Sequence, residues 1–454
     1  MSEKPCTLCV GCGRCETYSK DIDVLTKGGL PQQVATFPCD VYKEVYNQGD
    51  VIVCVDIGTT TVAMTLRKLA DGQVLDIFTA MNPQREYGND VLSRMGKKDA
   101  KKQMQTAIEK VLCEGISKFK SKVNALKDDA GVNGSFAGTP CEQTCTIKGM
   151  VVTGNTTMLY LLQGLDVAEL SVAPFQASHT QQLWTKIGNL DTLLMPGISA
   201  FVGADVLAGM FALSMDAGLE NEVPEPKILQ GTVLLDLGTN GEMVYAGAEG
   251  LIATATPAAP AYEGGNFGQQ IFGADYVSLL AYLLEEGYMD ETGLLADPYF
   301  DDGIVIAEQK MTQQDIRRLQ LAKGATSAGL QILTKRNLPA VVYLAGGFGY
   351  YLDGKKAEKI GLLPTGFGEK SVAVGNLALE GAFLYGQSQF SKVIDSGLVR
   401  PEVRERAIQI SSQAYEHIHA MKEHTKVLNL AMEPDFEKIY LDSLNFGGKQ
   451  SWNT

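Results

Sequence analysis

Residues 51–64 read VIVCVDIGTTTVAM, an apolar and β-branched run that leads into Asp56 and then into a glycine–threonine turn. Short apolar runs of this composition predict a buried strand, here over residues 51–56. Residues 232–244 read TVLLDLGTNGEMV and repeat the order of strand, aspartate, any residue, glycine and threonine. The two copies predict two related lobes, each with a strand that ends at an Asp-x-Gly-Thr turn.

These turns have the chemistry of a phosphate site. Glycine lets the backbone approach a ligand closely, and threonine or asparagine side chains and backbone N–H groups donate to phosphate oxygens. Asp56 and Asp236 carry the same charge sign as phosphate and are therefore expected to hold Mg²⁺ or its waters. Neither a Walker A sequence nor G-x-G-x-x-G after the first strand occurs, which disfavours the P-loop and Rossmann folds.

A third glycine-rich element is YLAGGFGYYL at 343–352, again an apolar strand that runs into glycines. Gly346, Gly347 and Gly349 leave no side chains, so a flat adenosine can lie against this backbone. A helix is predicted over 313–333, from which Lys323 or Gln320 is expected to reach a ribose; an ordinary surface lysine is the alternative for Lys323.

Nine cysteines are unevenly spread along the chain. Cys6, Cys9, Cys12 and Cys15 form C-x2-C-x2-C-x2-C, and Cys39 follows a proline. Thiolates at this spacing surround one small volume, which favours a [4Fe–4S] cluster with either Cys15 or Cys39 as the fourth ligand; a tetrathiolate zinc is the alternative.

The other cysteines are interpreted separately. Cys54 and Cys113 are expected to be small buried apolar side chains, in a strand and in a helix respectively. Cys141 and Cys145 are spaced C-x3-C, so a second metal site at these two cysteines stays an open alternative.

Composition limits the remaining function classes. The 454 residues carry a net charge of −14 with 45% hydrophobic content, which supports full-sized cores and disfavours nucleic-acid binding. The longest apolar runs are shorter than a membrane span, and the first residues lack the apolar core of a signal peptide. We expect a cytoplasmic protein without membrane or nucleic-acid partners.

The order of these elements resembles the phosphate and adenosine motifs of the actin, sugar-kinase and heat-shock-chaperone ATPase superfamily. GNTTMLYLLQG (154–164) and VGNLALEGAF (374–383) take the places of its two connecting motifs. More narrowly, the chain is similar to the reductive activators of corrinoid-dependent enzymes. The similar stretches include NPQREYGNDVLSRM (82–95), PGISAFVGADVLAG (196–209), PAYEGG (260–265) and DFEKIYLDSLNF (435–446).

The resemblance implies an α/β fold: a two-lobed, actin-like (ribonuclease H-like) ATPase with a short N-terminal iron–sulfur head. The expected domains are the head at 1–48, lobe I at 49–205, lobe II at 206–372, and a connecting helix with a C-terminal extension on lobe I at 373–454. Typical members carry a complete ferredoxin domain, whereas this chain has a short four-cysteine head, and Ala259 replaces the family's glycine.

The implied cofactors are ATP, Mg²⁺ and the cluster. Asp56 and Asp236 then position Mg²⁺ and water, and Asp205 is a candidate base or metal group with helix capping as its alternative. The expected nucleotide contacts and cluster ligands are Gly58, Thr59, Thr60, Asn155, Thr156, Gly238, Thr239, Asn240, Glu263, Gly264, Lys323, Gly346, Gly347 and Gly349 for ATP, and Cys6, Cys9, Cys12, Cys15 and Cys39 for the metal.

The implied activity is ATP-dependent return of a corrinoid protein from cob(II)alamin to cob(I)alamin, with an electron donor such as ferredoxin or flavodoxin. The protein is expected to be a monomer or a homodimer. Two alternatives stay open: an activator of another low-potential iron–sulfur enzyme, and a small-molecule kinase with a structural zinc head.

Overall fold

The computed structural model describes residues 39–47, 49–88, 90–132, 145–214, 230–238, 240–256, 273–306, 309–391 and 400–447. These residues form two compact units, which we call lobe I and lobe II. Lobe I comprises the described residues within Leu30–Lys227 and Leu377–Glu423, and lobe II those within Ile228–Asn376 and His424–Thr454. Both lobes are α/β, in agreement with the predicted fold class.

The division differs from the predicted domains in three places. The boundary expected at 205/206 falls inside helix α7 (Ala204–Ser214), which packs on α13 (Leu377–Phe390) within lobe I because nearly all its side chains are apolar and buried. The end of the chain belongs to lobe II instead of lobe I, because β14 (Thr425–Val427) pairs with a lobe II strand. Helix α2 (Cys39–Val45), placed in the head, packs in lobe I, where the adjoining Tyr46 donates to Gln387 O.

Lobe I is built on a six-stranded sheet of order β3-β2-β1-β4-β6-β5. β1 pairs antiparallel with β2 and parallel with β4. The bounds of its other elements are β1 Asp50–Ile57, β2 Thr61–Lys68, β3 Val74–Met81, η2 Pro83–Tyr87, α3 Val91–Met95, η3 Lys98–Ala100, α4 Lys101–Val132, β4 Thr146–Gly154, α5 Thr156–Gln163, α6 Ala168–Ser171, β5 Leu183–Ile187, β6 Leu190–Leu194 and α14 Pro401–His424.

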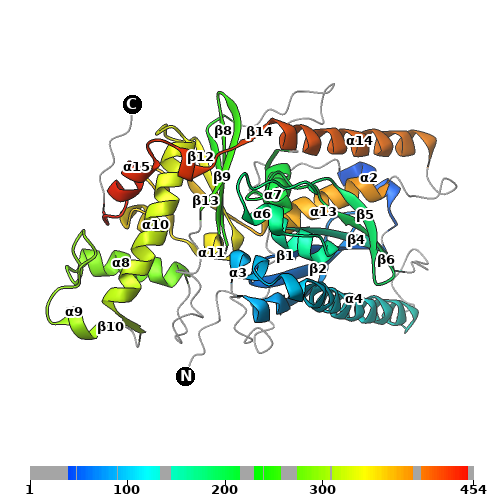
Figure 1. Cartoon of the computed structure of the whole chain (residues 1–454). Helices are drawn as coiled ribbons and strands as arrows, with labels where there is room; N and C mark the ends of the chain where they lie inside the picture. Colours follow the sequence, from blue (N-terminus) through cyan, green and yellow to red (C-terminus); the bar gives the residue numbers. More distant parts are fainter. Residues whose placement is uncertain are drawn as a thin grey trace. The chain divides into compact units, whose positions relative to one another are not determined.

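Helices cover both faces of this sheet, with α13 on one side and α4 on the other (Figure 1). This double cover explains why residues 51–55 of β1 are buried without alternation. Helix α4 has an apolar stripe at helical spacing, because Met104, Ile108, Leu112 and Ile116 are buried. Cys54 is buried as expected, but Cys113 is exposed, which corrects that prediction: it directly follows Leu112 and points away from the stripe.

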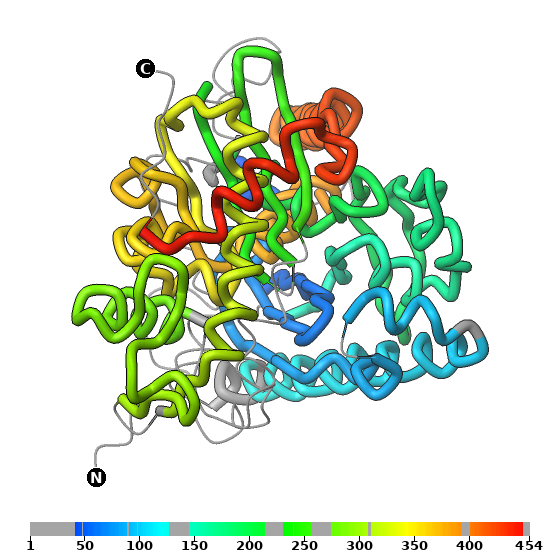
Figure 2. Tube along the Cα trace, turned by 60° about the vertical axis from the view of Figure 1, so that its left-hand side comes forward, coloured from blue at the N-terminus to red at the C-terminus, as the bar shows by residue number. Residues whose placement is uncertain are grey.

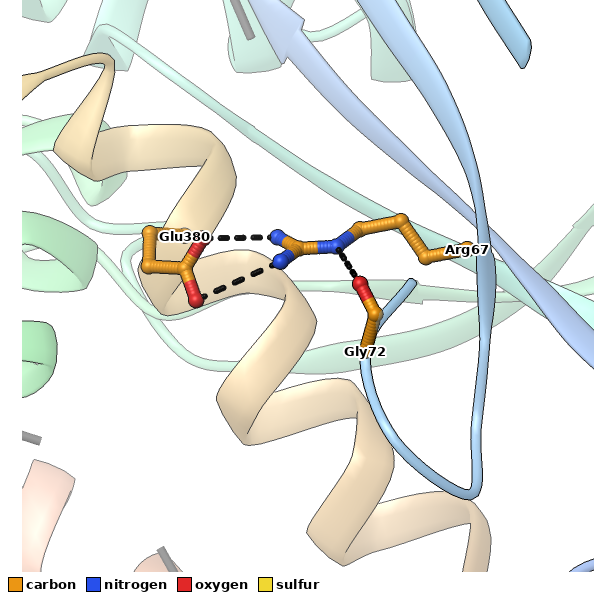
Figure 3. A network of polar contacts seen from close by, with 3 residues as sticks. All are labelled: Arg67, Gly72 and Glu380. Atoms are coloured by element: carbon orange, nitrogen blue, oxygen red, sulfur yellow. Dashed lines mark hydrogen bonds and ion pairs between the residues drawn. The ribbon is translucent and has the colours of Figure 1, made fainter. Parts of the chain in front are cut away.

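An ion pair attaches α13 to the sheet. Arg67 on β2 donates to both carboxylate oxygens of Glu380 on α13, at 2.7 and 3.4 Å, and to the carbonyl of Gly72 at 3.1 Å (Figure 3). The guanidinium also lies 4.1 Å from the ring centroid of Phe383. The Arg67 and Glu380 side chains are only 12% and 11% exposed, so each charge depends on the other for compensation.

Lobe II repeats the arrangement with a six-stranded sheet of order β13-β12-β7-β8-β9-β14. β7 pairs antiparallel with β8 and parallel with β12, as β1 does with β2 and β4. The remaining elements are β7 Thr232–Leu237, β8 Gly241–Gly247, β9 Gly250–Thr256, α8 Gly273–Glu285, α9 Tyr299–Asp302, β10 Ile304–Ile306, β11 Gln309–Met311, α10 Gln313–Leu333, β12 Val341–Ala345, α11 Gly346–Tyr351, α12 Gly354–Lys359, η6 Gly368–Lys370, β13 Ser371–Gly375, η8 Leu430–Met432 and α15 Phe436–Asp442.

The last described residues of the chain lie along α10. Figures 1 and 2 both show α15 beside that helix. Gln320 and Gln331 of α10 donate to Leu444 O and Ser443 Oγ, at 2.9 and 3.0 Å. The ring of Phe446 is fully buried in the lobe II core, so this segment is part of lobe II.

None of the helices among the described residues is long and apolar enough to span a bilayer.

We predict that Glu380→Gln lowers the free energy of unfolding of lobe I by about 3 kcal/mol, because it leaves the Arg67 charge buried without its partner. Chemical denaturation followed by fluorescence measures this loss. The matched control is Asp191→Asn, which breaks the exposed pair with Lys186 in the same lobe and should leave the free energy of unfolding nearly unchanged. Equal effects of both changes would contradict the assignment.

Candidate nucleotide site

In lobe I the predicted phosphate turn follows β1 directly. Asp56 pairs with Thr153 in the parallel neighbour β4, and the next pair is Ile57 with Gly154. The turn itself is closed by a hydrogen bond from Gly58 N to Thr61 O at 2.9 Å. Two predicted elements, the turn after β1 and the GNTT stretch after β4, therefore lie at the same edge of one sheet.

Gly154 permits this closeness. Its φ is +155°, and a Cβ at this position would lie 2.6 Å from Ile57 O, a distance that real Cβ atoms do not adopt. Any side chain would therefore push the two strand ends apart. The glycine at the start of GNTT is required by the packing of β4 against β1.

Asn155 joins the two turns. Its Nδ2 donates to Thr59 Oγ1 at 2.9 Å, and its Oδ1 accepts from Met158 N as the N-cap of α5. Thr156 is buried and donates to Ser199 O at 2.5 Å. Thr59 and Thr60 are also buried as whole residues, 4% and 8% exposed.

Asp205 lies beside these turns. Gly203, two residues earlier, is so close to them that a Cβ there would lie 2.6 Å from both Asn155 Cα and Asp205 Oδ1. Asp205 stands in the first turn of α7, where its Oδ1 accepts from Val206 N at 2.9 Å. Lobe I therefore gathers Asp205 and the two strand-end turns in one place.

Lobe II holds the second copy. Asp236 of β7 pairs with Ala345 of β12, and Gly346 follows with φ +78°. A Cβ on Gly346 would lie 2.6 Å from Asp236 Oδ1 and 2.7 Å from Leu237 O. The turn after β7 is closed by Gly238 N donating to Asn240 O at 3.0 Å.

The glycines after β12 are helical, where the sequence predicted only that an apolar strand runs into glycines. Residues 346–351 form the short helix α11, in which Gly349 is buried and Gly347 is partly exposed. Gly346 nevertheless occupies the place in lobe II that Gly154 has in lobe I, one residue beyond the partner of the aspartate. The internal repeat predicted from two stretches thus extends to the adjoining parallel strands.

The prediction for Lys323 is wrong. Its side chain is fully buried, and its Nζ donates to Ser443 O at 2.7 Å and to Asn445 O at 2.8 Å. Nζ also lies 4.7 Å from the ring centroid of Phe446. Gln320 likewise donates to main-chain carbonyls, those of Thr292 and Leu444. Both side chains hold the C-terminal segment and leave no surface for a ribose.

Several predicted positions lie outside the described residues: Thr239, Glu263, Gly264, Cys6, Cys9, Cys12, Cys15 and Cys141. Cys39 is the first residue of α2, and Cys145 is buried. Within the described ranges, no group of three or more His, Cys, Asp or Glu side chains is arranged to hold a metal ion. The cluster and its ligands therefore stay predictions.

Sequence reasoning missed two residues of the lobe I site. Asn82 donates to Gly58 O at 2.8 Å, and Arg94 donates to Thr59 O at 2.6 Å. Both side chains are fully buried. They lie in the NPQREYGNDVLSRM stretch, which had been noted only for its family resemblance. Both side chains bind main-chain carbonyls, and residue spacing carries no signal for such contacts.

The duplicated sheets and their glycine-ended strand pairs define the ASKHA class, that of actin-like ATPases and sugar kinases, as predicted. Comparison with known proteins agrees: residues 51–218 match the RACo middle region, and residues 269–393 match the C-terminal ASKHA domain of RACo.

The chain belongs to the RACo family of corrinoid reductive activators. A curated relative, the corrinoid activation enzyme RamQ of Eubacterium limosum, is 26% identical over 87% of this chain and 70% of its own length. A solved structure described as a reductive activator for corrinoid, iron–sulfur protein superposes with a TM-score of 0.64. It is 25% identical and covers 89% of this chain and 67% of its own.

Lys323 provides a pH-dependent test of the lobe II core. Burial lowers the pKa of its ammonium from 10.5 to about 7. Between these values the unfolded chain binds one more proton than the folded chain, so the free energy of unfolding should rise with pH from about 7 to about 10. Lys323→Met should remove this rise, whereas Lys335→Met, on an exposed pair, should keep it. Denaturation curves at several pH values measure both, and a rise unchanged in Lys323→Met would contradict the pKa direction.

Proposed function

We propose that this protein is an ATP-dependent reductive activator, which returns a corrinoid protein from the cob(II)alamin to the cob(I)alamin state. Membership of the RACo family supports the client class. The observation that carries ATP dependence is the duplicated turn. In each copy an aspartate at the end of one strand lies beside the end of the neighbouring strand, where a glycine without a side chain permits the close approach.

We assign the nucleotide contacts of each lobe separately. In lobe I we assign Gly58, Thr59 and Thr60 to phosphate, with Asn155 and Thr156 shaping the adjoining turn. Thr153 supports a polar ligand nearby, since its buried Oγ1 has no hydrogen-bond partner in the described part of the chain and the residue pairs with Asp56. In lobe II we assign Gly238, Thr239 and Asn240 to phosphate and Gly346, Gly347 and Gly349 to the nucleoside. Glu263 and Gly264 are assigned as further nucleotide contacts.

The aspartates act on charge and water. The carboxylates of Asp56 and Asp236 would hold Mg²⁺ directly or through its waters, and the bound ion would offset the negative charge of the phosphates and orient the attacking water. We assign Asp205, beside the Asn155 turn, as the base that would accept a proton from that water. ATP and water yield ADP and phosphate, and this free energy drives a one-electron reduction that ordinary donors do not complete.

The electron reaches the client through the cysteine-rich head in this proposal. Cys6, Cys9 and Cys12, with Cys15 or Cys39, would hold a [4Fe–4S] cluster, which when bound supplies a one-electron carrier. A reduced ferredoxin or flavodoxin gives up the electron, and the cobalt of the client protein gains it. A cytoplasmic location, as a monomer or homodimer, is consistent with this chemistry.

The first test concerns the nucleotide site. Asp56→Asn and Asp236→Asn should each lower kcat for ATP hydrolysis by about a hundredfold or more, because the transition state loses its metal-organising carboxylate. Phosphate release measures the rate. The control is Asp191→Asn, an exposed carboxylate of lobe I paired with Lys186, which should keep its activity. Unchanged hydrolysis in both active-site variants would refute the assignment.

The second test concerns the head. Protein purified without oxygen should contain about four iron atoms per chain and absorb broadly near 400 nm, and Cys9→Ala should lose both. With ATP and a reduced donor, the wild type should convert the cob(II) spectrum of a corrinoid protein to that of cob(I). If the protein contains zinc instead of iron and does not convert the cob(II) spectrum, the result would favour the alternative of a small-molecule kinase.

A further inference from the structure

One segment of lobe I binds the carbonyl side of the phosphate turn. Asn82 Nδ2 donates to Gly58 O at 2.8 Å, Arg94 Nη2 donates to Thr59 O at 2.6 Å, and Asn82 N donates to Thr60 O at 2.9 Å. Three consecutive carbonyl oxygens of the turn are therefore directed toward residues 82–94, a segment that includes α3, next to β1 and β2 in Figure 1.

The direction of the carbonyls fixes the direction of the amides. In a planar trans peptide, the C=O and the N–H of the same unit point in opposite directions. The N–H of Thr59 shares its unit with Gly58 O, and the N–H of Thr60 shares its unit with Thr59 O. Both amides are thus directed away from residues 82–94. Successive amides presented together form a concave donor site for anions.

Arg94 adds charge to this geometry. Its guanidinium is fully buried, with Nε donating to Gly88 O at 2.8 Å and Nη1 lying 3.3 Å from Met158 Sδ. The planar fork is therefore held at three points, and an arginine keeps its proton at any accessible pH.

Asn82 is held just as firmly. Its Oδ1 accepts from Gln84 N at 3.0 Å and caps η2, while its Nδ2 reaches Gly58 O. The side chain is fully buried, so its conformation is set before a ligand arrives. Binding then requires little ordering of the turn, which is how preorganisation increases affinity.

We propose that Asn82 and Arg94 are positioning residues, which hold the Gly58–Thr60 turn so that its amides bind the phosphate groups of a nucleotide. This inference rests on the proposed function. It names the phosphate chain, and not the nucleoside, as the part of the ligand whose affinity depends on these two side chains.

The test compares binding of MgADP and of adenosine to the full chain by calorimetry, in variants that keep most of the native contacts. Asn82→Asp keeps the oxygen that caps η2 but loses the donor to Gly58. Arg94→Lys keeps the charge but loses the fork, and Arg94→Met loses both. Arg85→Gln, on the same segment with its Nη1 3.6 Å from Met81 Sδ, is the matched control.

MgADP affinity should fall about tenfold in Asn82→Asp and Arg94→Lys and further in Arg94→Met, while adenosine affinity stays within about twofold. Hydrogen exchange of the ligand-free peptide over residues 57–61 should become faster in the same variants, and Arg85→Gln should match the wild type. If Asn82→Asp does not fold, Asn82→Ala replaces it, since it removes the donor without adding a charge.

Two results would overturn the inference without touching the proposed function: MgADP affinity unchanged in the folded variants, or equal losses for MgADP and adenosine. If the wild type itself does not bind MgADP, the proposed function fails first and the inference falls with it.

Discussion

The close approach of a glycine to a neighbouring parallel strand sets the geometry of both lobes. Gly154 packs closely against Ile57 in lobe I, and Gly346 packs closely against Asp236 and Leu237 in lobe II. Each contact brings the end of one strand against the aspartate-bearing end of the next, at a distance that excludes any side chain. The aspartates, the turns after them and the helices that begin beyond the glycines all take their positions from these two contacts.

Buried basic side chains donate hydrogen bonds to main-chain carbonyls outside the sheets. Arg94 donates to Thr59 O of the lobe I turn and to Gly88 O, Lys323 donates to two carbonyls of the C-terminal segment, and Arg67 donates to Gly72 O in addition to Glu380. Turns and tails have main-chain acceptors without partners in a sheet or helix, and leaving such groups buried is costly. A single long side chain with several donors can satisfy two of them at once, so the same physical device serves a turn, a tail and a helix contact.

The sequence predicted the parts of this fold that depend on local pattern. The strands around residues 51–56 and 232–236, the helix over 313–333 and the repeat of strand, aspartate and glycine are confirmed. Lys323 was mistaken for a ligand contact because periodicity places a residue on a helix face but does not say what covers that face, here the segment at Ser443 and Asn445. Asn82 and Arg94 were missed for a related reason: hydrogen bonds to main-chain carbonyls leave no trace in residue spacing.

Helix α13 has a consequence for how the chain folds as it is made. Every residue from Leu377 to Phe390 is buried, largely against β1, β4 and α7 of lobe I. The ribosome synthesises all of Ile228–Asn376 before this helix, and at cellular rates this synthesis takes roughly seven to thirty seconds. During that interval the apolar face that α13 will cover has no partner from its own lobe. Lobe II, whose segment Ile228–Asn376 is made as one piece, can therefore complete most of its core before lobe I closes, and a nascent chain of this design needs protection at the uncovered sheet.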